Sequence, residues 1–265
     1  MSQKMRELRN TEEGIWQNPD NYRDKNMTYK LKRPLKKLSD EQFLEDIKRY
    51  IKSSYEFYNS KVPELRVLGR RLHEEYELKK FYKVFNKLWN SGYNQERSLA
   101  IYTLQLYKED FDLDTWKFIK IKLKDMKSWD QIDSVSENII GEILKKNSVL
   151  EKEIIKFSND RSIWFKRISL ISTIPYLKHK KNVKFSLKIV EQLLYHKENQ
   201  IEMAVGRVLK EMSKIDPEST KRFILKHMNM SDETFMHSTE NLKELRKIRK
   251  LKKLKPKKRK FVFWR

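Results

Sequence analysis

The sequence has 265 residues, with 60 Lys and Arg against 37 Asp and Glu and a formal net charge of +23. With five glycines and six prolines, glycine-rich nucleotide loops and turn-dense β-sandwiches are poor candidates. The absence of cysteine excludes disulfides, iron–sulfur clusters and thiolate zinc sites. No apolar run approaches the roughly 18 residues of a membrane-spanning helix, and the N-terminus lacks the apolar stretch of a signal peptide. The composition predicts a soluble helical protein, and its charge favours a polyanionic partner.

From Ser39 onward the chain reads as one helix after another, with almost none of the alternation that is typical of strands. Capping residues, prolines and apolar stripes mark about twelve helices joined by short links. The predicted helices cover approximately residues 40–58, 63–77, 79–90, 95–108, 115–126, 129–146, 149–157, 162–172, 183–196, 200–214, 217–228 and 231–250.

The helix ends are predicted from capping boxes, in which a Ser or Thr is followed three residues later by Glu or Gln. Pro175 is expected to end the helix over 162–172. Gly206 lies inside a predicted helix, where it costs about 1 kcal/mol relative to Ala, and this indicates close packing or the close approach of a ligand. The predicted capping boxes are Ser39 with Gln42, Ser128 with Gln131 and Ser148 with Glu151, and Asp112 or Asp114 and Asp216 are further expected caps.

The helix pairs recur with a regular spacing. The segments around Trp129, Arg167 and Arg207 lie 38 and 40 residues apart, and roughly 40 residues is the period of HEAT-like helix pairs. Stacked pairs form a solenoid whose concave face is lined by equivalent positions of successive units. The sequence therefore predicts an all-α, HEAT-like helical-repeat solenoid (an α–α superhelix) with a basic concave face, which suits duplex DNA.

The positive charge divides the chain into three parts. Residues 1–38 carry a net +5, residues 39–242 carry +6 and residues 243–265 carry +12. We therefore expect a basic N-terminal extension, a HEAT-like helical-repeat domain and a basic C-terminal tail. A like-charge block is typical of an interaction arm, and the alternative is a solvated, lysine-rich end. The tail residues expected to contact DNA phosphates are Lys257, Lys258, Arg259 and Lys260.

Two segments place an ionisable residue beside a tryptophan. Trp129 and Asp133 are four residues apart, so an indole and a carboxylate lie on one helix face. Trp164 and Arg167 share a face of another helix, and arginine is a good fork for phosphate. From spacing alone, a surface Asp beside an edge Trp and a core Trp with a solvated Arg stay open as alternatives.

Taken together, these segments resemble the AlkD family of DNA alkylation repair proteins, which are HEAT-like-repeat DNA glycosylases. The likeness covers roughly residues 45–225, and its runs are KSWDQIDSV, SNDRSIWFKRISLI, IEMAVGRVLKEMSK, VPELRVLGRRL and LWNSGYNQERSLAIYTL. It implies that Trp129 and Asp133 form the catalytic patch and that Arg167 contacts the DNA backbone. Where the family has a second tryptophan on the opposite wall of the cleft, this chain has Arg207.

The chemistry that the resemblance implies needs few groups. An N3- or N7-alkylated purine is cationic, so it leaves the sugar as a neutral base without a general acid. A carboxylate stabilises the oxocarbenium-like sugar and orients water, and an indole favours the cationic nucleotide. We therefore expect a glycosylase acting on such purines in duplex DNA, with Asp133, Trp129 and Arg167 as its catalytic residues. The expected DNA-binding residues of the body are Lys127, Trp164, Lys166 and Arg207.

Other functions have less support in the sequence. Its five histidines are scattered without an H-x-x-H or H-E-x-x-H pair, so no metal site is expected. A lyase that uses a lysine Schiff base stays open because lysines are numerous. The main alternative is a non-catalytic HEAT-repeat protein that binds distorted or branched DNA, which Arg207 favours. A protein-binding scaffold fits the charge of +23 poorly.

The remaining expectations concern partners and location. The partner is expected to be duplex DNA with alkylated bases, and neither a cofactor nor a membrane is expected. We further expect a monomer in the cytoplasm, associated with the nucleoid through its DNA binding.

Overall fold

The computed structural model of the protein describes residues 62–91, 93–126 and 128–254. These residues form helices and turns, and no strand occurs among them. Their contacts divide the chain into two compact units, one ending at Tyr107 and the other beginning at Lys108. None of the helices in these three ranges is long and apolar enough to span a bilayer.

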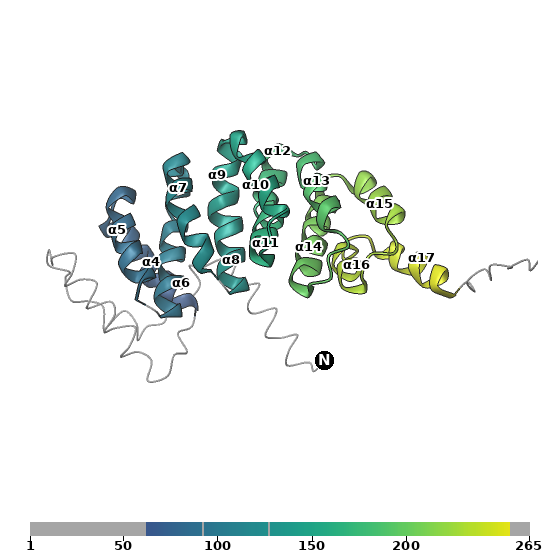
Figure 1. The fold of residues 1–265 in the computed structure, drawn as a ribbon, viewed down its shortest axis with the longest axis horizontal. Helices are drawn as coiled ribbons and strands as arrows, with labels where there is room; N and C mark the ends of the chain where they lie inside the picture. The colour runs from purple at the N-terminus through teal and green to yellow at the C-terminus, as the bar shows by residue number, and fades with distance from the viewer. Residues whose placement is uncertain (1–61, 92, 127, 255–265) are drawn as a thin grey trace, which may run out of the picture. The chain divides into compact units, whose positions relative to one another are not determined.

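The first unit contains the helices α4 (Val62–Glu75), α5 (Leu78–Trp89) and α6 (Asn94–Gln105) (Figure 1). Apolar residues at helical spacing form its core, since Phe81, Phe85 and Trp89 of α5 are all buried. The Phe85 and Trp89 rings stack with centroids 5.4 Å apart. The structure confirms the three helices predicted over 63–77, 79–90 and 95–108. Helix α4 begins one residue before Pro63.

The second unit contains the other helices of the described residues and the candidate site. Among them, α8 continues through a π-helical turn, Ser136–Ile140, into α9, so the three segments form one helix. The helices are α7 (Leu113–Lys122), α8 (Trp129–Val135), α9 (Gly141–Lys146), α10 (Glu151–Ser158), α11 (Ile163–Ile171), α12 (Thr173–Lys180), α13 (Lys184–Leu193), α14 (Asn199–Ile215), α15 (Pro217–Lys226), α16 (Asp232–Ser238) and α17 (Lys243–Leu254).

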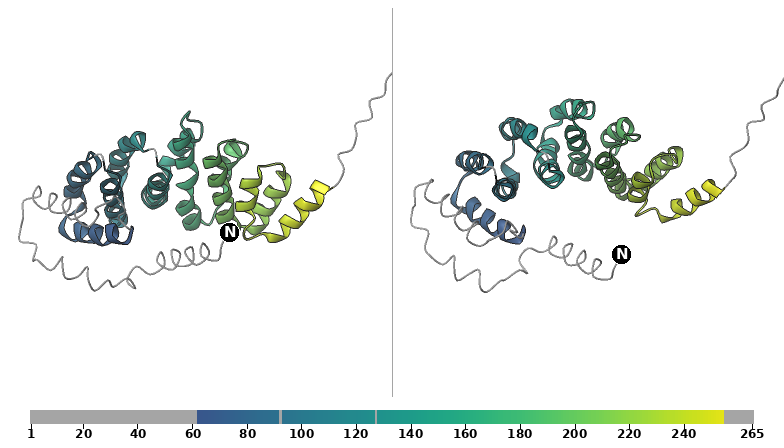
Figure 2. Two further views of the ribbon diagram at one scale, coloured as in Figure 1. Left: turned by 90° about the horizontal axis from the view of Figure 1, so that it is seen from below. Right: turned by 60° about the horizontal axis from the view of Figure 1, so that its bottom comes forward.

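The helices of this unit pack as successive pairs. Helix α11 packs against both α8 and α14, and α14 packs against α16, so these helices lie side by side (Figures 1 and 2). Helices α10 and α13 pack on α11, and α12 packs on α9 and α14. The repeat of roughly 40 residues thus brings α8, α11 and α14 next to one another. Each of them carries one of the polar residues singled out in the sequence.

Several helix ends agree with the predicted caps. The Asp112 side chain accepts hydrogen bonds from the backbone N–H groups of Asp114 and Thr115, in a capping box with Thr115. The Asp216 side chain accepts one from Ser219 and precedes Pro217 at the start of α15. Such caps satisfy backbone donors that the first helical turn leaves unpaired.

Two predicted capping boxes were wrong. Ser148 lies in a 3₁₀ turn, and Leu150 is the residue that precedes α10. Ser128 does precede α8, but its side chain makes no capping bond and its hydroxyl donates to the Asp130 carboxylate instead. A nearby acidic side chain thus competes for the hydroxyl that the capping box requires. The box predicted at Ser39 lies outside the described residues.

The predicted end of the helix over 162–172 agrees with α11 within one residue, but the role predicted for Pro175 was wrong. The helix ends at Ile171, and Pro175 lies in the first turn of a further helix, α12. Proline is tolerated there because the first helical N–H groups have no partner within the helix. The predicted helix over 231–250 is likewise two helices, α16 and α17.

Close packing explains the buried glycine of α14. A Cβ atom at Gly206 would lie 2.6 Å from the His237 Cβ and 3.0 Å from the Thr234 carbonyl oxygen. Helices α14 and α16 therefore approach at this point more closely than a side chain allows. Of the two interpretations open at Gly206, the structure supports helix packing.

Candidate active site

The centre of the candidate site is Asp133, in the middle of α8. Its carboxylate accepts two hydrogen bonds from Arg167 of α11, from Nε to Oδ1 and from Nη2 to Oδ2, both at 2.7 Å. The Arg167 side chain is only 5% exposed and that of Asp133 is 14% exposed. This bidentate pair fixes the plane of the carboxylate, because a guanidinium presents its donors in a rigid fork.

Arg167 also contacts a third helix, α14. Its Nη1 donates to the backbone carbonyl of Gln200, in the first turn of α14. One side chain thus links α8, α11 and α14, which explains why an arginine is buried among them. The alternative of a solvated arginine is wrong, and the described donors of Arg167 face Asp133 and Gln200. Its contact with the DNA backbone stays a prediction.

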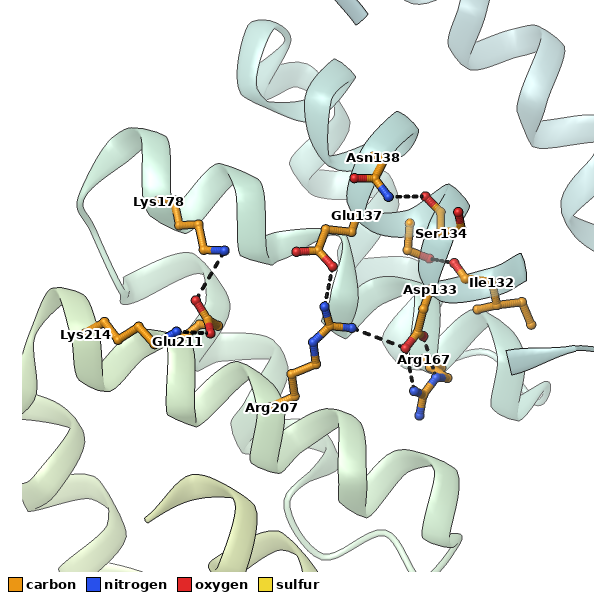
Figure 3. Close-up of polar contacts among 11 residues, drawn as sticks. Ile132, Asp133, Ser134, Glu137, Asn138, Arg167, Lys178, Arg207, Glu211 and Lys214 are labelled. Carbon is orange, nitrogen blue, oxygen red and sulfur yellow. Dashed lines mark hydrogen bonds and ion pairs between the residues drawn. The ribbon is translucent and has the colours of Figure 1, made fainter. Parts of the chain in front are cut away.

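A second arginine approaches Asp133 from α14. The Arg207 Nη1 lies 3.3 Å from Asp133 Oδ2, and its Nη2 donates to Glu137 Oε2 (Figure 3). The Arg207 side chain is 39% exposed, far more than that of Arg167. We call Asp133, Glu137, Arg167 and Arg207 the Asp133 cluster. It contains two carboxylates and two guanidinium groups, so its formal charge is zero.

Trp129 lies on α8, four residues before Asp133. It is the first residue of the helix and is 57% exposed, whereas Ile132 and Val135 are buried. Trp129 is therefore not a core residue. Its exposed indole, one turn before the carboxylate, offers a face for a cation or a base. The position agrees with the prediction that Trp129 and Asp133 lie on one helix face, which is not the face of the buried Ile132 and Val135.

The remaining predicted residues lie on α11 or outside the described ranges. Trp164 and Lys166 are half-buried, and the Lys166 Nζ lies 3.3 Å from His196 Nε2. The structure thus groups Asp133, Arg167 and Arg207 directly, with Trp129 on the same helix as Asp133. The predicted DNA-binding residues outside the described ranges are Lys127, Lys257, Lys258, Arg259 and Lys260.

Glu137 is the residue that sequence reasoning missed. It follows Asp133 by one turn and lies in the π-helical turn Ser136–Ile140. Its spacing of four residues from Asp133 was the available signal, because such residues are neighbours on a helix. Nothing in the sequence shows that Arg207, 70 residues away, is its partner.

A second group of charged residues, centred on Glu211 of α14, can be compared with the Asp133 cluster. Glu211 lies one turn after Arg207 and binds Lys214 Nζ at 2.6 Å and Lys178 Nζ at 3.3 Å (Figure 3). Burial alone would raise the pKa of Glu211, but the two lysines together hold it below its ordinary value. We call Lys178, Glu211 and Lys214 the Glu211 cluster.

Comparisons with known proteins place the chain in a family. A family model described as DNA alkylation repair enzyme matches residues 31–242. The match spans most of the chain, so the protein belongs to the DNA alkylation repair enzyme family, as the AlkD resemblance predicted. No curated protein matches the sequence.

Solved structures show the same fold. A protein described as a predicted DNA alkylation repair enzyme from Enterococcus faecalis has a TM-score of 0.62 and 18% identity, covering 79% of this chain and 99% of that chain. AlkD2 from Streptococcus mutans has a TM-score of 0.57 and 14% identity, covering 74% of this chain and 98% of that chain. The structure of smu.31 from Streptococcus mutans UA159 has a TM-score of 0.56 and 14% identity, covering 76% of this chain and 98% of that chain. These likenesses confirm the predicted all-α, HEAT-like fold.

Proposed function

We propose that the protein is a DNA glycosylase that hydrolyses the N-glycosidic bond of cationic N3- or N7-alkylated purines in duplex DNA. The observation that carries this proposal is a carboxylate, Asp133, held rigidly by Arg167 one helical turn after the exposed Trp129. Membership of a DNA alkylation repair family supports the substrate class.

The reaction requires one bond to break and one to form. The C1′–N bond breaks and its electron pair stays on the alkylated base, which leaves neutral because it was cationic. Water then attacks C1′ and releases a proton to solvent, leaving an abasic site. The positive charge that develops on the sugar is stabilised by the fixed carboxylate of Asp133, and the carboxylate orients the water.

Each other residue has a distinct role in this proposal. Trp129 offers its indole face to the cationic nucleotide. Arg167 holds Asp133 in one orientation, so no reorganisation of the carboxylate is needed as charge develops. Basic side chains of the body, such as the half-buried Lys166, and the basic tail hold the phosphate backbone without reading its sequence.

A second candidate function rests on Arg207. In the AlkD family this position is a tryptophan, and here an arginine donates to the carboxylate that the chemistry requires. That contact favours a non-catalytic protein that binds distorted or branched DNA. We place it second because Arg207 is 39% exposed and bound to Asp133 at one oxygen only.

The test is base release from duplexes that carry one defined lesion. Duplexes with N3-methyladenine or N7-methylguanine should lose the base under single-turnover conditions. A neutral lesion such as uracil should persist, because the proposed set of Asp133, Trp129 and Arg167 contains no general acid to protonate its leaving group. Tight binding to branched DNA without release of either methylated base would favour the second candidate.

A further inference from the structure

Glu137 stands outside the chemistry described so far, yet it makes the closest contact to Arg207. We propose that Glu137 is a positioning residue that holds the Arg207 guanidinium away from Asp133 and so preserves the negative charge that faces the sugar. The expected effect of Glu137 on base release rests on the proposed glycosylase activity. The expected effect of Glu137 on the position of Arg207 does not.

The contacts of Arg207 are unequal. Its Nη2 is in tight contact with Glu137 Oε2, while its Nη1 lies 3.3 Å from a single oxygen of Asp133. Arg167, in contrast, meets both oxygens of Asp133 at 2.7 Å. Arg207 thus divides its two terminal nitrogens between the two carboxylates, whereas a fork on Asp133 alone would need both of them. Glu137 therefore competes with Asp133 for Arg207.

The charges show why this competition matters. With Glu137 present, the two carboxylates and the two guanidinium groups cancel. Without it, Asp133 would face two arginines and the cluster would carry a net +1 where the reaction creates a cation on the sugar. Such a charge acts over a few ångströms in a partly buried site, where screening by water is weak.

The backbone supports this role for Glu137. It lies in the π-helical turn that follows Asp133, and π turns inside α-helices are frequent at functional sites. The turn is stabilised by the Ser136 hydroxyl, which donates to the Ile132 carbonyl at 2.6 Å. The Glu137 side chain is 24% exposed, and that of Arg207 is 39% exposed. Both side chains thus retain access to solvent, so substitution of either one does not disrupt the hydrophobic core.

The kinetic test is a double-mutant cycle on the full chain. Single-turnover release of N3-methyladenine is measured for the parent, Glu137→Gln, Arg207→Gln and the double variant. We expect Glu137→Gln to slow release by about tenfold to hundredfold, because Arg207 then closes on Asp133 and neutralises the carboxylate that faces the sugar. We expect the same substitution to change the rate less than twofold when Arg207 is already glutamine.

Two kinetic outcomes would overturn the proposal. Release by Glu137→Gln at the parental rate would show that Glu137 does not protect Asp133. An equal slowing with and without Arg207 would show that Glu137 acts on its own or only through stability. Glu137→Asp, which keeps the charge, should restore most of the rate. Loss of activity in this variant as well would also contradict a role of Glu137 through its charge.

A structural readout keeps this inference separate from the proposed function. Crystal structures of the parent and of Glu137→Gln need no activity. In the variant we expect both Nη atoms of Arg207 on Asp133, and Arg207 turned to solvent would overturn the proposal even if the parent releases base. If the parent releases no base but Arg207 closes on Asp133 as expected, the positioning role stands and the glycosylase proposal fails.

Discussion

Helix α14 contributes residues to two charged clusters, with Arg207 in one and Glu211 and Lys214 in the other. The two clusters are similar in composition but differ in geometry. In the Asp133 cluster, a carboxylate on α8 binds Arg167 and Arg207 from two other helices. In the Glu211 cluster, a carboxylate on α14 binds Lys178 of α12 and Lys214 of its own helix. Both have one central carboxylate between two cations.

The difference lies in geometry and burial. Arg167 is 5% exposed and binds through a fork, whereas Lys178 and Lys214 are 51% and 49% exposed and bind as point charges. An ammonium on a flexible stem fixes no plane, and exposed pairs are screened by water. The comparison teaches that the Asp133 cluster is built to orient a carboxylate, while the Glu211 cluster only compensates a charge.

The largest expected effect on stability is that of Arg167. Arg167→Met removes the bidentate partner of a mostly buried Asp133 and leaves the single contact of Arg207 at 3.3 Å, so we expect a loss of about 3 kcal/mol in the free energy of unfolding. The matched control is Lys178→Met, which should cost less than about 1 kcal/mol because that side chain is half-exposed and Lys214 remains. Urea denaturation measures both, and equal losses would remove the distinction between the clusters.

The next effect concerns the side of the Asp133 cluster formed by Arg207. Arg207→Trp removes a positive charge from Asp133 and supplies an aromatic face for a cationic base. We expect release of N3-methyladenine to rise by about threefold to tenfold, consistent with a cation–π contribution of about 1 kcal/mol. Single-turnover rates test this, and an unchanged or lower rate would show that Arg207 does not limit excision.

Acid should weaken the Glu211 cluster. The pKa of Glu211 lies below its ordinary value in the folded protein, so its contribution is complete above the ordinary pKa and is lost as pH falls through the folded value. At about pH 7 the free energy of unfolding of the parent should exceed that of Glu211→Gln by about 1 kcal/mol. Screening by solvent keeps this difference small. Denaturation of both proteins down to about pH 3 should bring the two stabilities together, and a constant difference would contradict this.

The smallest expected effect is on duplex affinity. Residues 255–265 contain six Lys and Arg, and their removal should weaken non-specific binding to intact duplex. The salt dependence should become shallower by roughly 0.9 in logarithmic slope for each DNA phosphate that the tail neutralises. Truncation after Leu254 keeps α17, in which Leu245 and Arg249 are buried. A slope identical to that of the full chain would show that the tail does not contact DNA.

The sequence predicts most of the fold because the helices carry local signals. The apolar stripe and the polar caps at Asp112 and Asp216 lie within a few residues of the ends that they define. The errors arise where a local signal has more than one meaning. Pro175 is compatible with both the end and the first turn of a helix, and only the packing of α12 on α9 and α14 decides between them.

The candidate site is less accessible to sequence reasoning. The pair of Trp129 and Asp133 was visible because both lie on one helix. The pairing of Asp133 with Arg167 spans 34 residues, and that with Arg207 spans 74. Such contacts depend on how α8, α11 and α14 pack. Glu137 was missed for the same reason, since its partner comes from another repeat.

The most direct test of the account is the dependence of base release on Asp133. Single-turnover release of N7-methylguanine from duplex DNA is measured for the parent and for Asp133→Asn, together with the affinity of each for the same duplex. We expect release by the parent and a loss of about a hundredfold or more in the variant, at similar affinity. Equal rates for the two proteins, or no release by the parent, would contradict the proposal that this carboxylate stabilises the sugar cation.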